Sequence, residues 1–174
     1  MIPEDTVKNK TGWKVFLITF IPMLMCIGCD YIEKLTEHEI VAEQNAYLRG
    51  NTYWAGFMNL LENEDWNNYK SVIQEITQIK VEYRVTRNGT PSDISIDFYF
   101  GENSPDTFLG NAILVQGETH TELQTLILDN SYYQLIDLIM RTDSFWYSIQ
   151  GSTDLADVDF EPVRVTINGT FNLN

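Results

Sequence analysis

Four acidic residues crowd into a segment near the C-terminal end of the chain. They are Asp154, Asp157, Asp159 and Glu161. Carboxylate oxygens are the ligands that calcium prefers, and a loop can gather several of them around one ion. The spacing does not match an EF-hand loop, which also requires a central glycine. We therefore consider calcium as a possible cofactor, beside the simpler interpretation that this is a solvated loop of an acidic protein.

Catalytic chemistry has little support in the remaining residues. The two histidines are His38 and His120, and the only cysteines are Cys26 and Cys29. A zinc site would need further ligands, and a serine nucleophile would need a base and an orienting group. Paired carboxylates could cleave glycosides, but no spacing selects a pair. The sequence favours a protein that is not an enzyme and assigns no catalytic residue.

Three consecutive aromatic residues, Phe145, Trp146 and Tyr147, are the clearest candidates for a contact surface. They fall in a segment with strand character, where successive side chains point to opposite faces. At least one ring must therefore lie outside the sheet or under a covering element. Such a ring could contact another protein or a small ligand.

The composition limits the partners. Hydrophobic residues make up 44% of the chain and aromatic residues 13%, so the chain can build a packed core. The net charge of -14 repels phosphate backbones, which excludes nucleic acid as an expected partner.

The N-terminal segment has the pattern of a signal peptide. Lys8, Lys10 and Lys14 precede an apolar run of 14 residues, positions 15–28. A membrane-spanning helix needs roughly 20 residues, whereas the apolar core of a secretory signal needs about 7–15. Pro22 inside the run also disfavours a straight helix.

The residues Cys26-Ile27-Gly28-Cys29 resemble the lipobox of bacterial lipoproteins. The resemblance implies cleavage before Cys29 and attachment of lipid to that cysteine, with the membrane as the partner and the cell envelope as the location. Cys26 departs from the pattern, in which leucine is usual at this position. The alternative is an uncleaved anchor, and the choice between inner and outer membrane stays open. This interpretation divides the chain into a signal peptide (1–28), a lipidated tether (29–36) and one globular domain (37–174).

The first part of that domain, residues 37–77, has a helical pattern. Thr36 and Glu39 have the pattern of a capping box, and the residues of one helical face then recur at spacings of four and three. They are Ile40, Gln44, Tyr47, Asn51, Trp54, Met58 and Leu61. Asn63 or Asp65 could cap a second helix that continues to Ile76.

The second part, residues 78–174, has the period of two that is typical of strands. We expect strands over 79–86, 94–100, 112–116, 123–128, 145–149 and 163–173, with a helix over 132–141. Asn88-Gly89 is a turn signal that favours pairing of the first two strands as a hairpin.

The predicted fold is mainly β with helices: a two-layer antiparallel β-sandwich of about six strands, an N-terminal helical segment and one short crossover helix. A single sheet with helices on one face is the alternative. We expect a lipid-anchored envelope protein that acts as a binding or assembly module for another envelope protein or a small ligand. The alternatives are a lipid-anchored hydrolase with a carboxylate pair and a calcium-stabilised surface adhesin.

Overall fold

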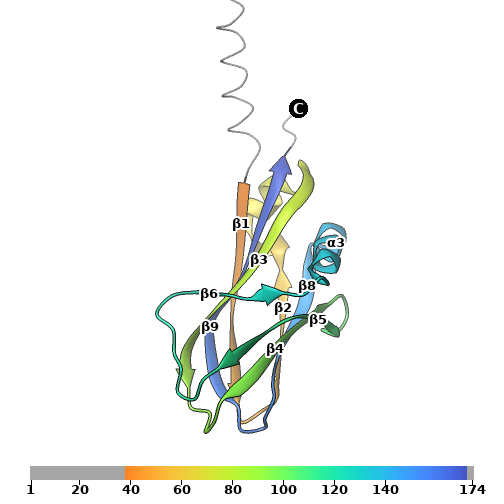
Figure 1. Cartoon of the computed structure of the whole chain (residues 1–174). Coiled ribbons are helices and arrows are strands. Elements are labelled where there is room, and N and C mark those ends of the chain that lie inside the picture. The colour runs from red at the N-terminus through yellow and green to blue at the C-terminus, as the bar shows by residue number, and fades with distance from the viewer. Residues whose placement is uncertain (1–37, 172–174) are drawn as a thin grey trace, which may run out of the picture.

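The computed structural model describes residues 38–171. Cys29, the expected signal peptide and the expected tether lie outside these residues. The described chain forms two facing antiparallel sheets with short helices at one end (Figure 1). The predicted two-layer antiparallel β-sandwich is therefore confirmed. None of the helices between residues 38 and 171 combines the length and hydrophobicity that a bilayer crossing requires.

Nine strand segments build the two sheets, more than the six expected. They are β1 (His38–Arg49), β2 (Tyr53–Asn59), β3 (Ile73–Asn88), β4 (Ile94–Gly101), β5 (Thr107–Leu114), β6 (Gln124–Thr125), β7 (Ile127–Leu128), β8 (Ser144–Gly151) and β9 (Asp157–Phe171). One sheet has the order β1-β9-β3-β6 and the other β2-β8-β4-β5-β7. The helical elements are η1 (Leu60–Glu62), α2 (Glu64–Tyr69) and α3 (Tyr132–Thr142).

The predicted helix after Thr36 is wrong, because residues 38–49 form strand β1. Ile40, Ala46 and Leu48 are buried, and Ala42 packs against the same core. These even-numbered residues alternate with outward-facing ones, but alanine and Gln44 are good helix formers and hid the period of two. Pairing with β9 along nearly the whole strand outweighs this local preference. Residues 53–59 likewise form β2 rather than a helix.

The second predicted helix is correct at its start and wrong in its length. The Asn63 side chain accepts a hydrogen bond from the backbone N–H of Trp66, as an N-cap residue does. The helix ends at Tyr69, and strand β3 begins at Ile73. The helical pattern predicts Ile76 in this helix, whereas the structure places it in β3, from which its side chain is buried in the core.

Strands β3 and β4 form where the alternation predicts them, but they do not pair with each other. β3 pairs with β9 in one sheet, whereas β4 pairs with β5 and β8 in the other. The Asn88-Gly89 turn crosses between the sheets, and the Gly89 N–H donates to the Asp157 carbonyl at 2.7 Å. A Cβ at Gly89 would lie 2.4 Å from the Asp157 carboxylate, so a larger residue there would force that side chain to move.

The predicted strand 123–128 is divided between the two sheets. Gln124 and Thr125 pair with β3, and Ile127 pairs with β5. The buried Leu126 lies between them, where the chain crosses from one sheet to the other. Strand β5 also begins five residues earlier than expected, at Thr107.

Helix α3 is confirmed over the predicted residues and buries Leu135, Leu138 and Ile139. It ends at Thr142, and the C-cap residue Asp143 has a left-handed backbone (φ 58°), a conformation that aspartate tolerates better than most residues. The Asp143 carboxylate accepts hydrogen bonds from Trp66 Nε1 and Lys70 Nζ, each at 2.9 Å. Asp143 therefore ties the end of α3 to α2 at one end of the sandwich.

Candidate binding surfaces

The acidic segment 154–161 is mostly strand rather than loop. Asp157, Asp159 and Glu161 lie on the outward face of β9, and Asp154 lies in the turn before it. Arg49 holds Asp159 through two hydrogen bonds of 2.7 and 3.0 Å. Two further hydrogen bonds, of 2.6 and 2.8 Å, join Arg87 to Asp157. The strand brings three of the four predicted ligands to one face, but arginines occupy two of them.

These pairs belong to a charged face that covers the outside of the four-stranded sheet. Its basic side chains are Arg49, Lys80, Arg84, Arg87 and Arg164. Arg164 pairs with Glu43, Lys80 with Glu82, and Arg84 donates to the Glu161 backbone carbonyl. Within residues 38–171, no group of three or more His, Cys, Asp or Glu side chains is placed to hold a metal ion.

We expect calcium to leave the melting temperature unchanged within about 1 °C, because an ion at Asp157 and Asp159 would have to displace both arginines. Differential scanning fluorimetry with calcium or a chelator checks this. A rise with calcium that Asp157→Asn abolishes would contradict the expectation and restore the calcium-adhesin hypothesis.

Strand β8 separates the three consecutive aromatic residues. Phe145 and Tyr147 point into the core and are 2% and 5% exposed, whereas Trp146 points outward and is 38% exposed. Burial raises the pKa of the Tyr147 phenol. Of the predicted contact surface, only Trp146 is thus accessible to a partner.

Trp146 belongs to a wider apolar face on the outside of the five-stranded sheet. Its ring lies 5.1 Å from that of Phe57 on β2, and the Tyr99 and Phe108 rings lie 5.6 Å apart on β4 and β5. We define the apolar face by its outward side chains Tyr53, Phe57, Tyr99, Phe108, Ile113, Ile127 and Trp146. Asp97 is the one charged side chain at the outward positions of these paired strands.

This face differs from an ordinary solvated sheet surface. An antiparallel sheet with one free face normally alternates apolar inward and polar outward residues. Here Phe57, Ile113 and Ile127 are 43%, 73% and 85% exposed on the outward side. The polar residues Ser95, Asn111, Ser148 and Gln150 occupy other outward positions of the same strands, so the apolar side chains form clusters on this face rather than one unbroken patch. Exposed apolar clusters are candidate sites of interaction with a protein, a membrane or a ligand.

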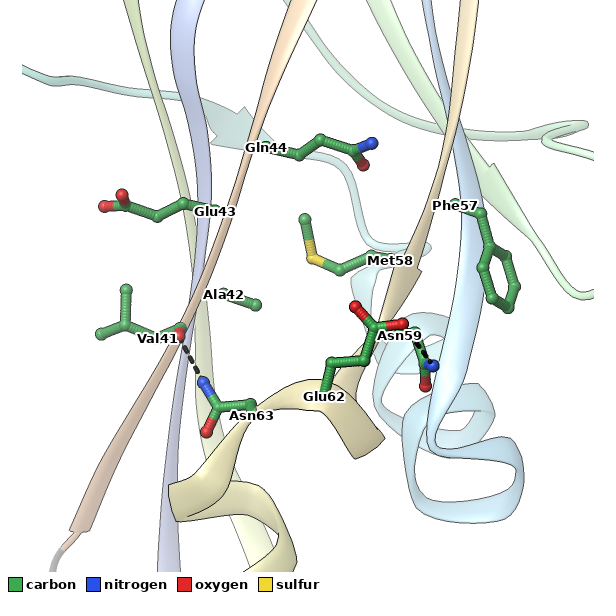
Figure 2. A pocket seen from close by; sticks show the side chains of 9 residues that line it. All are labelled: Val41, Ala42, Glu43, Gln44, Phe57, Met58, Asn59, Glu62 and Asn63. Atoms are coloured by element: carbon green, nitrogen blue, oxygen red, sulfur yellow. Dashed lines mark hydrogen bonds between the residues drawn. The ribbon is translucent and has the colours of Figure 1, made fainter.

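A separate groove opens between β1 and β2, the edge strands of the two sheets (Figure 2). Its volume is about 340 Å³, at the lower end of the range for ligand sites. It is lined by Val41, Ala42, Glu43, Gln44, Phe57, Met58, Asn59, Glu62 and Asn63. Asn63 Nδ2 donates to the Val41 carbonyl at 2.7 Å and so covers one backbone group of the β1 edge.

The groove presents hydrogen-bond acceptors. The Gln44 side-chain oxygen is buried and has no hydrogen-bond partner among the described residues. The Glu62 carboxylate accepts from Asn59 Nδ2 at 3.1 Å, while Glu43 points away from the groove toward Arg164 (Figure 2). A buried acceptor without a donor costs free energy, so a ligand that supplies a donor would be favoured.

His120, one of the two histidines of the chain, has a structural role. Its Nδ1 accepts from the Val85 N–H at 3.4 Å, so the proton lies on Nε2, which donates to Glu118 at 3.0 Å. The Val115 N–H and this histidine lower the pKa of Glu118. A glycosidase acid needs a raised pKa, so this carboxyl shifts in the opposite direction.

Comparisons with known proteins add no functional information. No protein-family model matches the chain, and no curated protein matches it. Among solved structures, a chain of Desmodium yellow mottle tymovirus is similar to it over 79% of this chain and 91% of that one, with 8% identity and a TM-score of 0.29.

Proposed function

We propose that this chain is a lipid-anchored envelope protein that binds another envelope protein through its apolar face. The observation that carries the proposal is the contrast between the two outer sheet surfaces. The charged face has its basic groups paired within the chain, whereas the apolar face exposes Phe57, Trp146 and Phe108. Large aromatic side chains in such patches commonly supply most of the binding energy of an interface.

The lipid anchor fits this function, because it would hold the sandwich close to a membrane without using either sheet surface. The support for the anchor is the lipobox resemblance at Cys26–Cys29, which lies outside the described residues. A membrane-attached binding module needs no catalytic group.

We expect a photo-crosslinking amino acid at Trp146 to capture a specific envelope protein in the native membrane. The matched control places the same amino acid at Tyr47, a half-exposed aromatic residue on the charged face. Capture at Trp146 should fall at least about tenfold when Phe57 is changed to serine, because removing a buried aromatic contact costs more than 1.4 kcal/mol. Equal capture at both positions, or no loss with Phe57→Ser, would contradict the proposal.

A further inference from the structure

The outer edge of β2 has free backbone groups. The Gly151 N–H donates to the Thr52 carbonyl at 2.8 Å, and the Leu60 N–H donates to the Asp143 carbonyl at 3.0 Å. In an antiparallel ladder this alternation continues, so even-numbered residues of β2 direct their backbone groups toward β8. The N–H and C=O groups of Ala55 and Phe57 therefore point to the opposite edge. No residue of the described chain forms a strand ladder there.

The groove lies beside this edge, and its charge is negative. Its nine lining residues include no base. Of its two acids, Glu43 points away and pairs with Arg164, so Glu62 supplies the negative charge of the groove. The Gln44 oxygen reaches close to Gly56, where a Cβ would lie 3.0 Å from it. A strand placed along β2 would alternate its side chains between the outer face and the side on which Gly56, Met58 and Gln44 lie.

We propose that an extended peptide segment of a partner protein adds as a strand to the free edge of β2 and places a lysine or arginine side chain in the groove. Backbone hydrogen bonds to Ala55 and Phe57 would provide affinity, and the alternate side chains would provide specificity. The basic group supplies the donor that Gln44 lacks and the positive charge that Glu62 attracts. This site meets the apolar face at Phe57, whose ring belongs to that face and whose backbone lies on the free edge of β2. It does not depend on the lipid anchor.

The test uses the full chain in detergent micelles and a displayed library of random linear peptides as the probe. Enriched peptides are synthesised with a fluorophore, and their affinities are measured by anisotropy. The deciding variant is Ala55→Pro, because proline removes the N–H at the free edge and is tolerated where that N–H faces solvent. Ala55→Val is its matched control, since valine keeps the N–H.

We expect enriched peptides to share a lysine or arginine and to bind Ala55→Pro at least about tenfold more weakly than Ala55→Val. Gln44→Met, which keeps the length of the unbranched side chain but removes the amide oxygen, should reduce the preference for the basic residue. This second variant keeps the test decisive if Ala55→Pro does not fold. The proposal is overturned if no peptide is enriched, or if the enriched peptides bind the Ala55 and Gln44 variants as tightly as the unchanged chain. It is also overturned if sedimentation shows that the edge instead joins two copies of the chain.

Discussion

Replacing Cys29 with serine is expected to abolish incorporation of labelled fatty acid into the chain, whereas Cys26→Ser leaves it intact. The lipobox resemblance places the thioether on the fourth residue of Cys26-Ile27-Gly28-Cys29. A serine hydroxyl cannot form that thioether. Each buried methylene contributes about 0.8 kcal/mol, so two or three acyl chains would anchor the chain far more firmly than one.

The measurement is labelled palmitate incorporation in the producing bacterium, followed by mass spectrometry of the N-terminal peptide. The two cysteines are matched controls for each other, because they lie three positions apart in one segment. Label that survives in Cys29→Ser, or disappears in Cys26→Ser, would contradict the assigned cysteine. A wild-type chain that carries no label and keeps residues 1–28 would favour an uncleaved anchor instead.

Local pattern predicted the strands whose inward residues are all large. In β3, Ile79, Val81, Tyr83 and Val85 are buried in strict alternation, and the same period identified β4 and β8. In β1 the inward positions include Ala42, Gln44 and Ala46, which carry no strong strand preference. Their strand conformation comes from pairing with β9, more than a hundred residues away, and no local window contains that information.

The candidate surfaces could be predicted only in part, for the same reason. Alternation required one ring of Phe145-Trp146-Tyr147 to face outward, and the structure identifies it as Trp146. The other members of the apolar face join it only through sheet register. The groove was beyond sequence analysis, because it forms between β1 and β2, both predicted as helix. The arginines at Asp157 and Asp159 are likewise 70 and 110 residues away in sequence.

Phe160→Ala is expected to lower the free energy of unfolding by about 3–5 kcal/mol, the range for deleting a fully buried phenylalanine ring. Phe160 is 0% exposed, and its ring centroid lies 6.1 Å from that of Tyr83 and 6.2 Å from that of Phe98. Phe98 comes from the opposite sheet, so the cluster joins the two layers of the sandwich. The cavity left by the ring would stay open, because the neighbouring rings lie on paired strands that cannot move inward to fill it, and the side chains that line it would lose their packing contacts.

Urea unfolding measures this change, and Phe108→Ala is the matched control. Phe108 is 38% exposed on the apolar face, so removing its ring should cost about 1 kcal/mol or less. The slope of the unfolding free energy against urea concentration (the m-value) should stay the same in both variants if each still unfolds from a complete sandwich. Equal losses from the two variants would contradict the expectation that the buried ring stabilises the sandwich more than the exposed one. A large loss from Phe160→Ala alone would show that the buried Phe160 ring, packed between the two sheets, is a main source of stability. It would thereby support the sandwich that carries the outer faces on which binding is proposed.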